Sequence, residues 1–151
     1  MPNIRIPACI SRLWLLWILL CPTALFAESP SMTIAHPDVT TSTLSATHAR
    51  LLFGMRLHQW ENQQPVKVFV LPDNHPVHDN YCKSVLHVFP HQLRTVWNRQ
   101  IYSGTGQAPV EVKNEEEMLE RVANTPGAVG YVSREKADKS KVRLIEVRGV
   151  M

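Results

Sequence analysis

Hydrophobic and polar positions along the chain predict an alternation of strands and helices. Residues 66–71 form a run rich in β-branched and aromatic side chains, which indicates a buried strand. Turn-forming residues follow over 72–76, and helical sequence begins at once, with Pro76 suited to the first helical position. Free backbone N–H groups and the helix dipole converge at such a strand–turn–helix junction. We therefore expect any small-molecule site to lie at this turn, although most connections of this kind bind no ligand.

The rest of the chain continues the alternation. Apolar residues at helical spacing predict helices over 46–53, 77–87 and 91–102 and a fourth helix capped by Asn114, and short apolar runs predict strands over 33–39, 128–132 and 142–147. Ser45 and Gly54 suit the two ends of the first helix, and Ile101 is expected to face inward on the third. Pro37 limits the first strand to an edge or an end. The order predicts one α/β domain with a mixed sheet flanked by about four helices.

Residues 1–27 have the layout of a secretory signal peptide. Arg5 and Arg12 form a basic start, residues 13–20 are an unbroken apolar core, and the sequence ALFA offers a cleavage site before Glu28. The apolar stretch is shorter than the roughly 20 residues that a membrane span needs. We expect cleavage and a periplasmic mature domain, residues 28–151, that does not span the membrane; an uncleaved anchor is the alternative.

Removal of the signal changes the charge and the cysteine count. Of the chain's 16 Lys and Arg residues, 14 remain, against 13 Asp and Glu, because Arg5 and Arg12 leave with the signal. A nearly neutral chain without a basic run gives no support for nucleic-acid binding. Cys82 remains as the one cysteine, so no internal disulfide can form. It falls in an apolar helical pattern and is expected to be buried, with a free thiol that pairs between chains as the alternative.

Three segments resemble the phosphate-binding periplasmic proteins of ABC transporters. ARLLFGMRLHQW at 49–60 resembles the LxxIFxGKxxxW segment of that family, LRTVWNRQIYSGTG at 93–106 is similar to the matching segment of a short, single-domain branch, and NTPGAVGYVS at 124–133 resembles TPGAIGYV. The segments occur in the family's order and spacing. The resemblance implies one lobe of a type II periplasmic-binding-protein fold. A single lobe offers an open surface unless a second protein supplies the other wall.

The resemblance places the family's phosphate grip at the turn after the buried strand. The family uses an Arg followed by a Ser-Gly-Thr run at a helix N-terminus, whereas residues 71–78 here read LPDNHPVH. Arg, Ser and Thr are missing from this stretch, Asp73 would repel a dianion, and Pro76 removes an N–H donor. Asn74, His75 and His78 remain as donors. We take these three as the candidate residues for binding phosphate or another small oxyanion.

The histidines and the cysteine also allow other interpretations. His75, His78 and Cys82 are spaced to share a helix face and could hold Zn or Cu, but four ligands are not evident. No G-x-S-x-G elbow, P-loop or dinucleotide fingerprint occurs, so we expect neither catalysis nor a cofactor. Glu115 and the two glutamates after it are expected to form a solvated helix start. Two hypotheses remain: a non-enzymatic solute-binding-like protein, or a ligand-less module that contacts an envelope protein.

Overall fold

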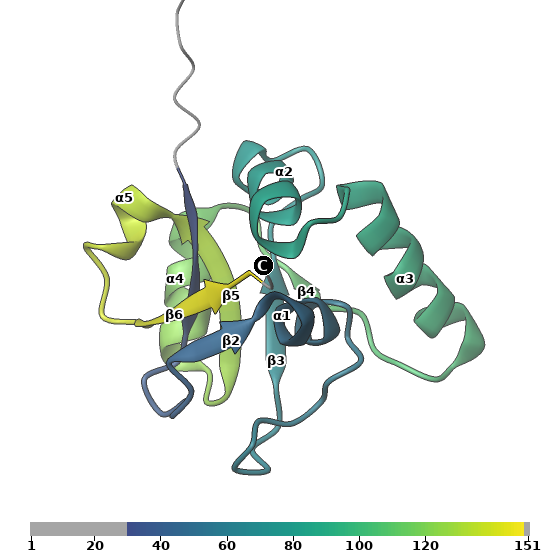
Figure 1. Ribbon diagram of the computed structural model, residues 1–151, viewed down its shortest axis with the longest axis horizontal. Helices are drawn as coiled ribbons and strands as arrows, with labels where there is room; N and C mark the ends of the chain where they lie inside the picture. The colour runs from purple at the N-terminus through teal and green to yellow at the C-terminus, as the bar shows by residue number, and fades with distance from the viewer. Residues whose placement is uncertain (1–29, 150–151) are drawn as a thin grey trace, which may run out of the picture.

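A six-stranded mixed sheet forms the centre of the fold in the computed structural model, which describes residues 30–149 (Figure 1). The expected signal peptide lies outside the described residues. The strands are β1 (Ser31–Ala35), β2 (Thr43–Ser45), β3 (Lys67–Val70), β4 (Val110–Glu111), β5 (Ala128–Ser133) and β6 (Arg143–Arg148). They stand in the order β2-β6-β1-β5-β3-β4. β1 is antiparallel to β5 and β6, whereas β3 is parallel to β4 and β5, and β2 is parallel to β6. The predicted α/β class with a mixed sheet is confirmed.

Helices cover both faces of this sheet. They are α1 (Ala46–Phe53), α2 (Pro76–Tyr81), which continues as the π-helix η1 (Cys82–Leu86), α3 (Pro90–Ser103), α4 (Glu115–Asn124) and α5 (Arg134–Ala137). On one face, Gly130 of β5 leaves room for α4, because a Cβ there would lie 2.4 Å from Met118 Sδ. On the other face, the next residue, Tyr131, stacks on Tyr81 of α2 with 4.2 Å between ring centroids and meets the ring of Phe53 of α1 edge-on. In Figure 1, α3 lies to the side of α1 and α2, at the rim of the molecule.

Local capping signals place the helix ends where the sequence predicts them. Ser45 Oγ accepts a hydrogen bond from the backbone N–H of His48 at 3.1 Å, and α1 ends at Gly54. Asn114 Oδ1 accepts from the N–H of Glu117 at 2.9 Å and starts α4. Because each cap needs only the residues within one turn, these boundaries could be predicted without knowledge of the tertiary structure.

Two predicted elements differ from the observed ones. β1 ends at Ala35, before Pro37, and lies in the interior of the sheet, since a proline beyond the strand's end leaves the strand free to pair on both sides. The predicted helix over 77–87 begins at Pro76 and changes to a π-helix at Cys82. It ends at His87, whose φ of 53° lies in the left-handed region.

Several expectations about exposure and short elements were wrong or missing. Ile101 is 44% exposed, because the inward side of α3 is limited to Leu93 and Trp97. Glu115 is buried instead of solvated: Oε2 accepts a hydrogen bond from the N–H of Ser133 at 2.6 Å. The short elements β2, β4 and α5 were not predicted, since two to four residues show no periodicity. Within residues 30–149, no helix has both the length and the hydropathy needed to cross a membrane.

Candidate functional site

The turn between β3 and α2 is held at both of its ends. Where β3 ends, the buried N–H of Leu71 donates a hydrogen bond to Tyr131 Oη at 3.0 Å. At the tip, the N–H of His75 donates to the carbonyl oxygen of Pro72 at 2.9 Å, and α2 begins at the next residue. The sequence therefore builds a fixed strand–turn–helix junction at the position where a ligand site was expected.

The three predicted ligand-binding residues lie at different depths of this turn. Asn74 is exposed at the tip. His75 is half-buried and caps α2, because its Nδ1 accepts from the N–H of Val77 at 3.2 Å. His78 is fully buried behind the turn. Asn74 and His75 thus lie on the solvent side, whereas His78 does not, and the first turn of α2 has lost two donors: Pro76 has no N–H, and that of Val77 is already bound.

An arginine from a distant helix reaches the turn. Arg94 of α3 donates from Nε to Asp73 Oδ2 at 2.9 Å and from Nη2 to Asp73 Oδ1 at 2.7 Å, which makes a bidentate pair. The same Nη2 donates to Glu111 at 3.2 Å. The guanidinium carbon lies 4.9 Å from the centroid of the Trp97 ring. The hydrogen bonds from Arg94 hold the pKa of the Asp73 carboxyl below its usual range.

Behind the turn, His78 belongs to a buried hydrogen-bonded network. Its Nδ1 is bonded to Tyr131 Oη, and its Nε2 lies 3.5 Å from Cys82 Sγ and 3.6 Å from Asp73 Oδ1. Burial lowers the pKa of His78, so the ring is neutral at pH 7. Tyr131 Oη already accepts from the N–H of Leu71, so its own proton is free to go to His78 Nδ1. We infer that His78 carries its proton on Nε2.

The electrostatics of the turn oppose a second anion. With His78 neutral, the charged groups are one guanidinium, Arg94, between two carboxylates, Asp73 and Glu111. The net charge of this cluster is negative, and its cation is bound on both sides. An oxyanion would have to displace Asp73 from Arg94 to gain a charged partner.

The buried histidine predicts a loss of stability in mild acid. The unfolded chain binds a proton near the ordinary His pKa of 6.5, but folded His78 does so only at lower pH. Since the unfolded state binds more protons in this window, the free energy of unfolding falls as pH drops below 6.5, by up to about 1.4 kcal/mol per pH unit. Urea denaturation at pH 7.5, 6.5, 5.5 and 5.0 measures this. His78→Gln should flatten the decline between pH 6.5 and 5, and the exposed-site control His91→Gln should leave it unchanged; an identical decline in His78→Gln contradicts the assignment.

The geometry also bears on the metal and thiol interpretations. His75 Nδ1 is used in capping α2, and residues 30–149 contain no group of three His, Cys, Asp or Glu side chains placed to hold a metal ion. Burial raises the pKa of the Cys82 thiol to about 12. The thiol therefore stays protonated at neutral pH, which makes it a poor ligand and a poor nucleophile. The expectation that Cys82 is buried is confirmed.

Sequence reasoning missed the residues that define this site most strongly. Arg94 pairs with Asp73 across 21 positions, and Tyr131 bonds to His78 across 53. One signal could have identified Arg94: it lies three residues before Trp97, on the same side of a predicted helix whose apolar positions were already assigned inward. No local signal marks Tyr131, which appears in the sequence as one apolar residue of a buried strand.

Comparison with known proteins gives matches to solved structures. A scan against protein-family models and a search of curated proteins each find no match. An ABC-type phosphate transport receptor from Vibrio cholerae matches with a TM-score of 0.60 and 14% identity over 79% of this chain. PstS from Borrelia burgdorferi matches with a TM-score of 0.63 and 14% identity over 80% of this chain. A putative phosphate ABC transporter substrate-binding protein from Clostridium perfringens, solved with bound phosphate, matches with a TM-score of 0.61 and 16% identity over 82%.

These matches concern the fold and part of the neighbours' length. The chain spans 46%, 47% and 46% of the three proteins, which is less than half of each. The chain therefore has the fold of a single lobe of a phosphate-binding protein of ABC transporters, as the resemblance in its sequence implied.

Proposed function

We propose that this chain is a secreted, non-enzymatic, solute-binding-like lobe of the periplasm, with an oxyanion-binding position at the turn over residues 71–78. The observation that carries the proposal is Arg94, whose guanidinium is delivered to the turn by α3. The family resemblance expects an arginine inside the turn, and Arg94 supplies the same planar, bidentate donor from another element. The fold likeness to phosphate-binding proteins supports the choice of phosphate or a similar small oxyanion as the ligand class.

In this proposal Asp73 competes with the oxyanion for Arg94. The Asp73 carboxylate already makes both hydrogen bonds that a bound oxyanion would make to the guanidinium. An incoming oxyanion would gain Arg94, Asn74 and His75 as partners but would meet the negative charge of Asp73 and Glu111. His78 acts from behind the turn, where it fixes the backbone through Tyr131. We therefore expect millimolar affinity or weaker for phosphate in the wild-type protein.

Replacing Asp73 with serine is expected to strengthen phosphate binding. The substitution frees Arg94 from one carboxylate and adds a hydroxyl donor at the turn. If the dissociation constant falls to about 1 mM, 10 mM phosphate stabilises the native state by about 1.4 kcal/mol, which raises the melting temperature by roughly 4 °C. Thermal melting with 0, 1 and 10 mM phosphate at constant ionic strength measures the effect in both proteins.

Two matched variants assign the effect. Asp79→Ser removes a carboxylate from α2, the helix that follows the turn; this carboxylate pairs with Lys83 at 2.6 Å and not with Arg94. This variant should melt like the wild type at every phosphate concentration. The double variant Asp73→Ser, Arg94→Gln should lose the gain. No phosphate-dependent shift in Asp73→Ser would contradict an oxyanion position at this turn.

A ligand-less protein-interaction module is the second candidate. It is favoured by the observation that Asp73, Arg94 and Glu111 satisfy one another without any bound solute. This candidate predicts that neither the wild type nor Asp73→Ser responds to phosphate. Its contacts with another envelope protein would then have to come from a surface away from the turn.

A further inference from the structure

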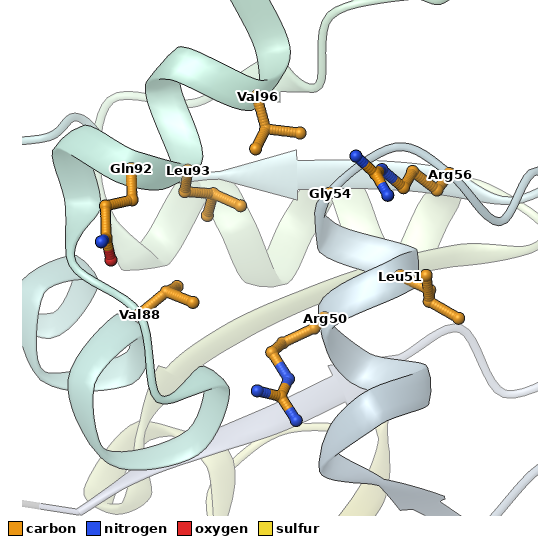
Figure 2. Close-up of a pocket in the computed structure, with 8 residues that line it drawn as sticks. All are labelled: Arg50, Leu51, Gly54, Arg56, Val88, Gln92, Leu93 and Val96. Carbon is orange, nitrogen blue, oxygen red and sulfur yellow. The ribbon is translucent and has the colours of Figure 1, made fainter.

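A groove with an apolar floor runs between α1 and α3. Figure 2 shows Val88, Leu93 and Val96 on the α3 side of it, facing α1 across the gap. The main cavity has a volume of about 200 Å³. A smaller cavity of about 120 Å³ shares Arg56 and Val96 with it and extends the groove along α3. Since a cavity of about 150 Å³ is large enough to hold benzene, the main cavity has room for one large apolar side chain.

Two hydrogen bonds hold α1 and α3 together at one end of the groove. Trp97 Nε1 donates to the carbonyl oxygen of Phe53 at 2.8 Å, and Gln100 Nε2 donates to that of Gly54 at 2.6 Å. Both acceptors lie at the C-terminal end of α1, where the last helical carbonyl groups have no partner inside the helix. The groove is therefore a fixed feature of the packing and needs no rearrangement to admit a side chain.

Cations without carboxylate partners line this groove. Arg50 and Arg56 stand at the rim in Figure 2, and Arg99 borders the smaller cavity. Among the ion pairs between described residues, none includes these three arginines. The sequence explains this, because residues 39–60 and 80–110 contain no Asp or Glu. The positive charge at the rim is thus not neutralised by the elements that build the groove.

We propose that this groove docks an acidic segment of another protein, with an apolar side chain in the cavity and carboxylates on Arg50, Arg56 and Arg99. An apolar anchor flanked by acidic residues matches both the floor and the rim, and helix-in-groove recognition uses this arrangement. Each planar guanidinium group can donate two parallel hydrogen bonds to one carboxylate. The site is separate from the turn over 71–78, since it uses neither Asp73 nor Arg94.

Other occupants fit the charges and the shape less well. The chain's own residues 1–27 contain Arg5 and Arg12 and no carboxylate, so they repeat the charge of the rim. In a second copy, the acidic start of α4 is already engaged: Glu115 is buried, and Glu116 and Glu117 pair with Lys136 and Arg121. An anionic membrane would match the charge, but a concave apolar floor accepts an inserted side chain better than a flat surface.

Selection of random 12-residue peptides displayed on phage, against the immobilised residues 28–151, tests the proposal. The selected sequences should combine an aromatic or aliphatic anchor with at least two Asp or Glu residues. The synthetic consensus peptide should bind in a fluorescence-anisotropy titration, and Arg50→Gln, Arg56→Gln should weaken it at least tenfold. Arg143→Gln is the matched control, because this exposed arginine of β6 does not line the groove and its Nη1 donates a hydrogen bond to the Thr40 carbonyl oxygen at 3.5 Å. It should bind the peptide like the wild type.

The remaining outcomes each count against the proposal. A consensus without acidic residues, or one that binds Arg50→Gln, Arg56→Gln as well as the wild type, overturns it. If the selection enriches no peptide, and the wild-type protein sediments with phosphatidylglycerol vesicles but the double variant does not, the surface binds a membrane instead. Concentration-dependent dimerisation that the double variant abolishes assigns it to a second copy. Asp73→Ser should leave peptide binding unchanged, so failure at the turn and failure at the groove can be distinguished.

Discussion

Replacing Trp97 with alanine is expected to lower the free energy of unfolding by about 3–5 kcal/mol. The side chain is only 1% exposed, and its ring fills the space between α3 and the rest of the core. Its Nε1 donates the hydrogen bond to Phe53 that fixes α3 on the end of α1. Truncation removes the apolar contact, leaves a cavity and frees the Phe53 carbonyl. Urea denaturation followed by circular dichroism measures the loss.

A graded pair of variants separates packing from the hydrogen bond at this position. Trp97→Phe keeps most of the apolar volume and loses the N–H donor, so it should cost less than the alanine variant. Tyr102→Ala is the control on the same helix, since this side chain is 88% exposed and should change stability by less than about 0.5 kcal/mol. A loss below 1 kcal/mol in Trp97→Ala would contradict the packing of α3 described above.

The same helix connects the two sites that have been proposed. α3 presents Arg94 to the turn over 71–78 and Leu93 and Val96 to the groove beside α1. Trp97 directly follows Val96 in sequence, and the Arg94 guanidinium lies over its ring. If Trp97→Ala folds, it should therefore weaken peptide binding at the groove. Added to Asp73→Ser, it should also weaken the binding of phosphate at the turn. Substitutions within either site should affect only that site.

The sequence predicted the elements whose boundaries depend on neighbouring residues. The caps Ser45 and Asn114 and the stop at Gly54 act within one turn of their helices, and all three lie where expected. The buried strand β3 was also predicted, and α2 begins at Pro76, one residue before the predicted helix, at a residue noted as suited to a first helical position. The position of the candidate turn was therefore accessible from the sequence.

The pairing of that turn with its charge partner was not accessible from the sequence. The spacing to Trp97 places Arg94 on the inward side of its helix, but it does not place Arg94 opposite Asp73. The stretch 71–78 contains no arginine, and the conclusion drawn from it was that a cation was missing. The fold brings Arg94 to the turn from α3. Between the turn and α3 lie α2, the π-helix η1 and the left-handed residue His87, and the hydrophobic periodicity of the sequence does not predict their combined geometry. The same limit applies to His78, whose spacing suggested a ligand donor. Its environment is decided by Tyr131 on β5, and that pairing depends on the register of the sheet.

Replacing Tyr131 with phenylalanine is expected to lower the free energy of unfolding by about 2–6 kcal/mol, although only one oxygen is removed. The hydroxyl serves two buried groups, since it accepts from the N–H of Leu71 at 3.0 Å and is bonded to His78 Nδ1. Each group would remain buried without a partner, at a cost of about 1–3 kcal/mol each. The ring and its stacking on Tyr81 are unchanged, so the measured loss reports the hydrogen bonds. Urea denaturation at pH 7.5 gives the value.

Two tyrosine-to-phenylalanine controls rank this effect. Tyr81→Phe removes a hydroxyl that is equally buried but bonded to one side chain, Thr33, at 2.7 Å, and it should cost about half as much. Tyr102→Phe should cost nothing measurable, because its hydroxyl is in water. Because Leu71 N–H and His78 fix the two ends of the turn, Tyr131→Phe should also increase amide exchange at residues 72–76 more than Tyr81→Phe does. Equal stability losses in Tyr131→Phe and Tyr81→Phe would contradict the double role of the Tyr131 hydroxyl and, with it, the fixed geometry on which the oxyanion position depends.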